Sequence, residues 1–258
     1  MKKKSKLDII IQARIGSTRL KGKVLKNYKN LTPLKILIER LKYCKNINEI
    51  IICTTKLKED KEIIKFCKKE NIKYFKGSKN DVLSRYFFTA KKFKSDAIVR
   101  ITSDCPLIDY RIINQMTSFF LKKKVDYYAN TYPLPTTYPD GMDIEIFNYK
   151  TLKAAHNKAR LPSEREHVTP YMYNSGKFLT IRKSLKKDLS KFRFCIDYKK
   201  DFILLKKFIN HFKKTIYTVS MYQLISFLKK KPNLIKYQKN INKWEGWTSS
   251  LKKDEAYL

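Results

Sequence analysis

The sequence lacks several features that would each point to a particular class of protein. Its 5 cysteines include no C-x-x-C pair, and their odd number argues against a closed disulfide framework and favours a reducing compartment. The 3 histidines, His156, His167 and His211, share no metal-ligand spacing with the cysteines, so a zinc site is not expected. No segment approaches the length of a transmembrane helix. We therefore expect a cytoplasmic protein without a membrane partner.

Several catalytic motifs are missing as well. The chain contains neither a Walker A loop nor a Rossmann G-x-G-x-x-G segment. It has no nucleophile-elbow sequence, so a Ser-His-Asp hydrolase has no support. It also lacks the Asp-x-Asp pair with which enzymes that transfer sugars from sugar nucleotides commonly hold a metal ion.

Negatively charged residues are scarce. The chain has 23 acidic and 58 basic residues, and its formal net charge is +35. Such a surface is the usual sign of nucleic-acid or membrane binding. However, only ten of the basic residues are arginines, and the lysines are scattered and form no stripe with aromatic residues. We interpret the charge as a compositional bias that would still attract anionic substrates. A specific nucleic-acid partner is not expected.

The length of 258 residues suits one α/β domain with a smaller subdomain. Apolar runs that predict strands alternate with helical periodicity, which indicates a mostly parallel sheet with helices on both faces. In such sheets ligands bind at the carboxyl ends of the strands. The expected strands are 7–12, 49–54, 73–75 and 97–101, and the expected helices are 34–41, 58–70 and 81–93.

The second half of the chain has a different pattern. Met142, Ile144 and Ile146 alternate with acidic residues, which predicts an edge or hairpin strand. Helices are expected near 150–159, 164–174 and up to His211, and strands near 178–182 and 192–196. The Lys/Asn-rich segment from residue 231 is expected to wrap over the body or to be partly disordered.

A loop rich in cations and hydroxyls follows the first strand. It contains Gly16, Ser17 and three cations, Arg14, Arg19 and Lys23. Glycine lets backbone N–H groups approach phosphate oxygens, and guanidinium groups offer bidentate contacts to them. This composition favours a triphosphate-binding loop, although a solvated basic turn would have the same spacing.

Taken with four later motifs in the same order, this loop resembles the signature of the cytidylyltransferases that activate acidic sugars. The resemblance is to their spore-coat polysaccharide biosynthesis (SpsF) branch and extends to about residue 250. The later motifs are Gly77-Ser78 with Asp81-Val-Leu-Ser-Arg-Tyr86, Arg100-Ile-Thr-Ser-Asp-Cys-Pro-Leu-Ile108, Asp140-Gly-Met-Asp-Ile-Glu145 and Ser163-Glu-Arg-Glu-His-Val-Thr-Pro-Tyr171.

The resemblance implies a Rossmann-like nucleotidyltransferase fold, CTP as the donor, an acidic sugar as the acceptor, Mg²⁺ as the cofactor and a homodimer. It places the cytidylyltransferase domain at 1–230, with 131–190 as an acceptor or dimerisation subregion, and leaves 231–258 as a C-terminal tail. The residues expected to bind the nucleotide are Gln12, Ala13, Arg14, Gly16, Ser17, Arg19, Lys23, Thr54, Arg85 and Asp104. Arg85 could instead pair with Asp81 at helical spacing.

For CMP transfer, positioning and electrostatic stabilisation matter more than a general base. The expected catalytic residues are therefore Arg14, Arg19, Lys23 and Asp104. Asp104 follows a strand end and can hold a metal ion, and Mg²⁺ takes only one or two protein carboxylates. Asp197 is the second candidate ligand, although its neighbours depart from the family pattern and it could instead cap the following helix.

The expected acceptor-binding residues rest on the resemblance alone. Arg165 could pair with a sugar carboxylate, but 164–167 could equally form pairs within a helix or at a dimer interface. Asp140 and Gly141 could simply form a turn. The full set is Asp140, Asp143, Glu145, Arg165, Glu166 and His167.

Two other functions remain open at this level. A glycosyltransferase of related fold also binds a nucleotide at strand ends, but the missing Asp-x-Asp pair and the basic first loop count against it. A protein that only binds RNA or anionic lipid would show an affinity that falls steeply with salt. The sequence names neither the sugar nor the base.

Overall fold

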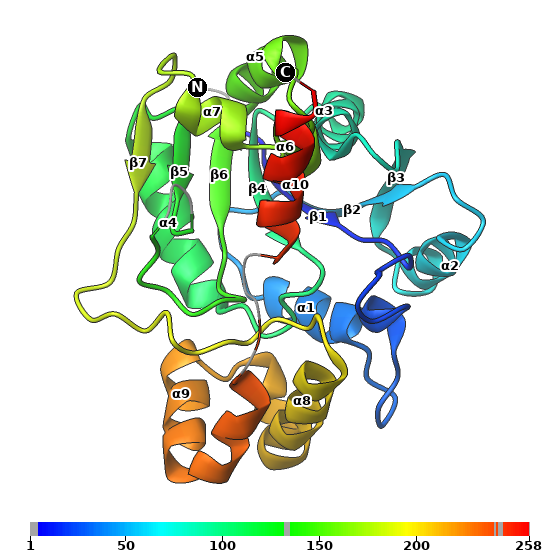
Figure 1. Cartoon of the computed structure of the whole chain (residues 1–258), viewed down its shortest axis with the longest axis vertical. Coiled ribbons are helices and arrows are strands. Elements are labelled where there is room, and N and C mark those ends of the chain that lie inside the picture. Colours follow the sequence, from blue (N-terminus) through cyan, green and yellow to red (C-terminus); the bar gives the residue numbers. More distant parts are fainter. Residues whose placement is uncertain (1–4, 132–134, 240, 242–244, 258) are drawn as a thin grey trace.

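The computed structural model describes residues 5–131, 135–239, 241 and 245–257 of the chain. In this described part, one sheet of 7 strands has the order β3-β2-β1-β4-β6-β5-β7 (Figure 1). Strands β1, β2, β3 and β4 pair with one another in parallel, and β6 is antiparallel to both β4 and β5. The predicted mostly parallel α/β fold is therefore confirmed.

The first half of the chain consists of successive strand–helix units, close to the predicted bounds. Helix α1 begins where Thr32 accepts a hydrogen bond from the backbone N–H of Lys35, with Pro33 at its first position. Asp81 caps α3 in the same way. The elements are β1 (Leu7–Gln12), η1 (Lys23–Leu25), α1 (Pro33–Leu41), β2 (Glu49–Thr55), α2 (Lys61–Lys69), β3 (Lys73–Gly77), α3 (Val82–Phe93), β4 (Ala97–Thr102) and α4 (Tyr110–Lys122).

Both faces of the sheet are covered, which explains why β1 is apolar throughout. Ile9 and Ile11 pack into the cluster that contains the apolar residues of α1, α2 and α4, whereas Ile10 packs into the cluster formed with α3 and α5. Successive strand residues point to opposite faces, so a strand between two helical layers needs apolar residues at consecutive positions.

One strand prediction in the second half is wrong, and another holds for only one of its two alternatives. The segment containing Ile146 is no edge strand, because β6 lies between β4 and β5, but it pairs antiparallel with β5, the strand that precedes it in the chain. Its acidic residue Glu145 is buried against Arg100 and does not face solvent. The segment 192–196 forms no strand and makes one isolated bridge, between Arg193 and Asp140. Its other backbone groups pair with loops, as when the N–H of Ile196 donates to the carbonyl of Asp104 at 2.8 Å.

The predicted helix 164–174 is divided in two, because Val168 has a φ of 74° and Pro170 follows it. The remaining elements are β5 (Tyr127–Ala129), β6 (Glu145–Asn148), α5 (Tyr149–Lys158), α6 (Pro162–His167), α7 (Pro170–Asn174), β7 (Thr180–Arg182), α8 (Lys199–Phe212), η2 (Lys213–Tyr217), α9 (Met221–Lys230), η3 (Pro232–Gln238) and α10 (Glu245–Glu255). Within the predicted subregion 131–190, residues 132–134 lie outside the described residues. The division into a domain and a tail stays a prediction.

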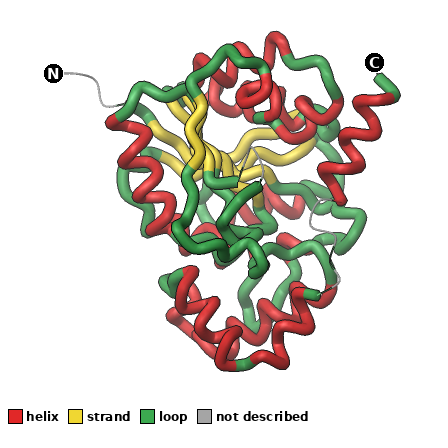
Figure 2. Tube along the Cα trace, turned by 60° about the vertical axis from the view of Figure 1, so that its left-hand side comes forward, coloured by secondary structure: helices red, strands yellow, loops and turns green. Residues whose placement is uncertain are grey.

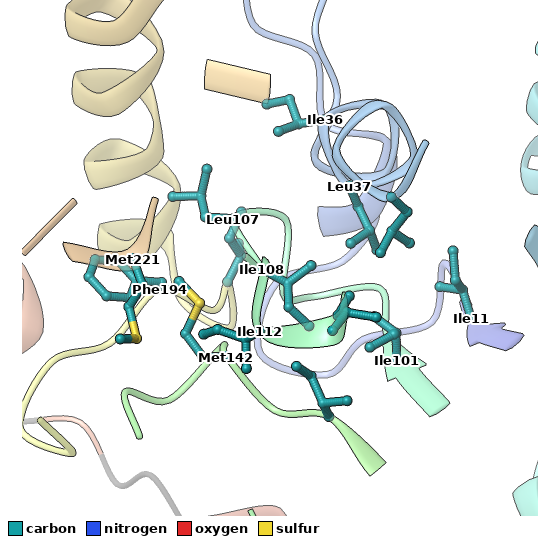
Figure 3. Close-up of a cluster of buried hydrophobic side chains, with 14 of the residues drawn as sticks. Ile11, Ile36, Leu37, Ile101, Leu107, Ile108, Ile112, Met142, Phe194 and Met221 are labelled. Atoms are coloured by element: carbon teal, nitrogen blue, oxygen red, sulfur yellow. The ribbon is translucent and has the colours of Figure 1, made fainter. Parts of the chain in front are cut away.

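A group of helices that includes α8 and α9 lies at one end of the molecule, below the sheet (Figure 1), and Figure 2 shows the same helical end from a view turned by 60°. It is joined to the sheet by a continuous apolar cluster, in which Leu37 of α1, Ile101 of β4 and Met221 of α9 take part (Figure 3). Arg40 reinforces this junction, because its buried guanidinium donates to the carbonyls of Ile108 and Val219 at 2.8 and 2.7 Å. In the described residues, no helix combines the length and apolarity needed to cross a membrane.

Candidate active site

A cavity of about 870 Å³ opens at the carboxyl ends of β1 and β4. The loop after β1 forms one wall, and α6 and α10 contribute to the other. Ten predicted site residues line the cavity: Gln12, Ala13, Arg14, Ser17, Arg19, Lys23, Arg85, Asp104, Glu166 and His167. The lining also includes Thr18, a hydroxyl of the same loop, and residues that sequence reasoning missed: Val24, Lys79, Asn80, Val82, Thr102, Ser103, Pro162, Glu245, Gly246, Ser249 and Lys253.

The loop after β1 is held in a compact turn. The backbone N–H of Gly22 donates to the carbonyl of Ile15 at 3.0 Å, and Gly22 has a φ of 68°, a conformation that favours glycine. The N–H of Ile15 in turn donates to the carboxylate of Asp60 at 2.6 Å. Asp60 is fully buried and also accepts from the hydroxyl of Thr55. This turn brings Lys23, which follows it, back toward Asp104 at the end of β4.

The ammonium of Lys23 lies between two carboxylates. It donates to Asp104 at 2.9 Å and to Asp197 at 2.8 Å. Burial alone would lower the pKa of Lys23, but the two carboxylates outweigh burial and raise it. Conversely, burial would raise the pKa of Asp104, and the charge of Lys23 holds it well below its usual range. Lys23 and Asp104 are therefore both charged at neutral pH.

Asp197 is oriented by a buried ionic network behind the cavity. Arg193 donates to Oδ2 of Asp197 at 2.6 Å and also pairs with Asp140 and Asp201. Oδ1 of Asp197 accepts from Arg19 at 2.6 Å. The backbone N–H groups of Asp197 and Tyr198 are capped by Asp201, each at 2.8 Å, so the carboxylate of Asp197 does not serve as the helix cap.

Asp104 and Asp197 fit the requirements of a Mg²⁺ site. One ammonium nitrogen contacts oxygens of both carboxylates, which shows that the pair converges on a single cation position. Among the described residues, no three His, Cys, Asp or Glu side chains come together as a metal cluster. Mg²⁺ does not require one, because it usually keeps several waters and binds through one or two carboxylates and substrate phosphates.

The other predicted nucleotide-binding residues differ in their surroundings. Arg14 is exposed and has no hydrogen bond or ion pair within the described part of the chain. Arg85 donates to the carbonyl of Ser78 at 2.6 Å and does not pair with Asp81. Thr54 is fully buried outside the cavity lining, and its hydroxyl has no partner among the described residues. Gly16 belongs to the loop wall but does not line the cavity.

Four of the predicted acceptor-binding residues have other contacts and do not line the cavity. Asp140 pairs with Arg193, and Glu145 pairs with Arg100 and accepts from Tyr127 at 2.7 Å. Asp143 accepts from the N–H of Gly141 at 3.0 Å, and burial together with Asp140 raises its pKa to about 7. Arg165 pairs with Asp81. Their roles toward the acceptor stay predictions.

Glu166 and His167 do line the cavity, and both contact α10. Ser250 Oγ lies 3.0 Å from Oε2 of Glu166 and 2.9 Å from Nε2 of His167, while Trp247 packs edge-on against the imidazole. Burial and then the charge of Arg100 lower the pKa of His167 to about 4. His167 is therefore neutral at physiological pH and contributes no positive charge to the cavity.

The comparisons with known proteins agree with this geometry. A cytidylyltransferase family model matches residues 9–243. An uncharacterized protein of Methanocaldococcus jannaschii is 37% identical over 238 residues, which cover 90% of this chain and 93% of that protein. The spore coat polysaccharide biosynthesis protein SpsF of Bacillus subtilis is 30% identical over 234 residues, covering 87% of this chain and 94% of that protein.

Among solved structures, a cytidylyltransferase from Leptospira borgpetersenii is 38% identical, with a TM-score of 0.85 over 92% of this chain and 98% of that one. The Rossmann-like nucleotidyltransferase fold expected from the sequence is thereby confirmed, and so is the resemblance on which that expectation rested. The chain belongs to the cytidylyltransferase family and is a nucleotidyltransferase.

Proposed function

We propose that this enzyme transfers CMP from CTP to an acidic sugar in the biosynthesis of a surface polysaccharide. The family match supports the nucleotidyl transfer. The ordered motifs, which resemble the enzymes that activate acidic sugars, support the acceptor class. The similarity to a protein named for spore coat polysaccharide biosynthesis supports the biological role.

One observation carries the proposal. Three cations of the loop after β1, Arg14, Arg19 and Lys23, line the same cavity as the carboxylate of Asp104. A triphosphate needs cations and backbone donors along its length, and the ion that bridges it to the protein needs a carboxylate facing them. The loop and the end of β4 supply both at the carboxyl edge of the sheet, where such folds bind nucleotides.

In the reaction, a hydroxyl oxygen of the sugar attacks the α-phosphorus of CTP. The bond from that phosphorus to the β-bridging oxygen breaks, and the products are the CMP-sugar, pyrophosphate and a proton. Arg14 and Arg19 bind phosphate oxygens and stabilise the charge that builds up on them. Asp104 and Asp197 would hold Mg²⁺, which supplies further charge neutralisation at the phosphates. Lys23, released from the carboxylates, donates to the phosphate chain.

A screen of CTP, UTP, GTP and ATP against a panel of acidic sugars, with pyrophosphate release as the readout, tests the proposal. We expect release with CTP and at least one acidic sugar. The variant Asp104→Asn should lose at least roughly 100-fold in turnover, as is typical when an electrostatic contact to the transition state is removed. Glu62→Gln is the matched control, because Glu62 is an exposed carboxylate of α2 that does not line the cavity.

Two results would contradict the proposal: no pyrophosphate with any acidic sugar, or full activity in Asp104→Asn. Cleavage of a preformed sugar nucleotide without CTP consumption would instead identify a glycosyltransferase. A homodimer and a cytoplasmic location are further parts of the proposal, which size-exclusion chromatography with light scattering and cell fractionation would test.

A further inference from the structure

The last helix, α10, forms part of the cavity wall and meets the loop after β1 at Glu245, which pairs with Arg19 at 3.4 Å. Glu245, Gly246, Ser249 and Lys253 all line the cavity. Glu245, Ser249 and Lys253 are four residues apart, so they share one face of the helix. Helix α10 begins beyond the segment 9–243 that matches the family model. The α10 part of this wall is therefore built from residues that the family match does not include.

A second face of α10 fixes the helix against α6 (Figure 1). Asp254 is buried and accepts from the backbone N–H of Ser163 at 2.8 Å, at the beginning of α6. One turn earlier, the buried hydroxyl of Ser250 contacts Glu166 and His167. Buried polar contacts of this kind are directional, so they define the rotation of α10 about its axis. The face with Ser249 and Lys253 is thereby directed to the cavity.

Ser249 and Lys253 retain donors that a ligand can use. The ammonium of Lys253 contacts Oε2 of Glu166 at 3.1 Å, but its side chain is 56% exposed and an ammonium has three donors. Within the described part of the chain, the hydroxyl of Ser249 has no hydrogen-bond partner. Each side chain can therefore donate to a bound group without breaking a contact that holds α10 in place.

The charges on this wall indicate what it binds. Of the described residues that line it on α6 and α10, Glu166 and Glu245 are acidic, His167 is neutral, and Lys253 is the one cation. Without Lys253 the wall would repel an anion. An ammonium and a hydroxyl one helical turn apart can both donate to the two oxygens of a carboxylate.

We propose that Ser249 and Lys253 bind the carboxylate of the sugar acceptor and thereby select an acidic sugar. This rests on the proposed function. The loop cations Arg14 and Arg19 bind the triphosphate on one side of the cavity, and the sugar hydroxyl must reach the α-phosphate. The sugar therefore lies between the two walls, with its carboxylate toward α10.

The test uses the full-length enzyme, an acidic sugar that it activates, and the carboxamide form of the same sugar. Lys253→Met removes the ammonium at nearly constant shape. Lys252→Met, which changes an exposed neighbour outside the cavity lining, is the matched control.

In Lys253→Met we expect the acceptor KM to rise roughly tenfold or more, as for loss of a charged hydrogen bond. The preference for acid over amide should fall by a similar factor, while the KM for CTP stays unchanged. Ser249→Ala should show a smaller effect of the same kind.

The outcomes separate this inference from the proposed function. If the wild-type enzyme releases pyrophosphate but Lys253→Met behaves like Lys252→Met, the carboxylate site is wrong and the function stands. A rise in the KM for CTP in place of the acceptor KM assigns Lys253 to the triphosphate and also overturns the inference. If the wild-type enzyme binds CTP in calorimetry but turns over no acidic sugar, the proposed function fails together with this site.

Discussion

Arg193 donates to one oxygen of Asp197 at 2.6 Å, and the other oxygen of the same carboxylate is the one that reaches Lys23 at 2.8 Å. The guanidinium is 2% exposed and also contacts Asp140 and Asp201. Its position behind the cavity makes it a positioning residue. It fixes the direction in which Asp197 presents its other oxygen, Oδ1, to Lys23 and Arg19, and it neutralises carboxylates that would otherwise repel one another.

Arg193→Met should therefore affect both stability and metal binding. Because it leaves buried carboxylates without their partner, we expect the free energy of unfolding to fall by about 3–5 kcal/mol. Urea denaturation measures this change. We also expect weaker Mn²⁺ binding in the presence of CTP and without acceptor, followed by electron paramagnetic resonance.

Lys191→Met, at an exposed position two residues away, is the control and should change stability by less than about 0.5 kcal/mol. Normal Mn²⁺ affinity in a folded Arg193→Met enzyme would show that Arg193 does not position Asp197.

Gly141 stands where no other residue fits. Its φ is 92°, and a Cβ atom there would lie 2.5 Å from the backbone nitrogen of Cys195. Gly141→Ala should therefore destabilise the protein by at least ~2 kcal/mol, since both backbone strain and a backbone clash arise. Thermal and urea unfolding check this expectation.

Gly246→Ala provides the comparison, because a Cβ atom there has no neighbour within 4 Å and the residue lies in a helix. Alanine should stabilise that position by up to about 1 kcal/mol. Equal effects of the two substitutions would refute the steric argument.

Asp143 makes the stability depend on pH. Burial and the neighbouring Asp140 raise its pKa to about 7, above the ordinary value of 3.8. Between these pH values the folded state binds the proton more tightly than the unfolded state. This contribution to stability is therefore complete below about pH 4 and is lost as the pH rises through 7.

Asp143→Asn should remove this part of the pH dependence, and urea midpoints between pH 4 and 8 would reveal it. The quantity to compare is the slope of the urea midpoint against pH, in the wild type and in Asp143→Asn, with Glu62→Gln as a control. Identical slopes in the wild type and Asp143→Asn would mean that Asp143 does not titrate in this range.

Arg14 offers a test of the loop that leaves the fold intact. It is exposed and, in the described residues, unpaired, so Arg14→Met should keep the wild-type stability. The KM for CTP should rise roughly 10- to 100-fold, as expected for a charge-assisted hydrogen bond. Lys21→Met, an exposed cation of the same loop outside the cavity lining, should leave it unchanged. An equal change of the KM for CTP in both variants would show that Arg14 attracts CTP only through its positive charge and makes no specific contact.

The parts of the site that sequence reasoning predicted lie at the ends of strands. Lys23 and Asp104 follow apolar runs that form β1 and β4, and parallel strands bring their carboxyl ends to one edge. Their proximity therefore follows from the pattern of strands. In the structure, Nζ of Lys23 lies 2.9 Å from Oδ2 of Asp104. The parallel sheet itself was predictable for the same reason, because runs apolar at every position indicate strands covered on both faces.

The parts that were missed depend on contacts between distant segments. Arg193 belongs to the segment 192–196, for which a strand was predicted, yet it lies in a buried ionic network with Asp140, which is 53 positions earlier. Glu145 was predicted only as an acidic residue of an alternating strand and as an acceptor-binding candidate, and its pairing with Arg100 on the neighbouring strand, which neutralises it in the interior, was not foreseen. Neither pairing leaves a periodic signal, since each depends on how two remote backbones meet.

The contact of α10 with α6 has a consequence for the diversity of these enzymes. The nucleotide side of the cavity is lined by residues 12–104, whereas the other side is completed by the eleven-residue helix α10. Chains that share every nucleotide-binding motif can thus carry different terminal helices. Exchanging that short piece between relatives offers a direct route to enzymes with a new substrate range and an unaltered chemical step.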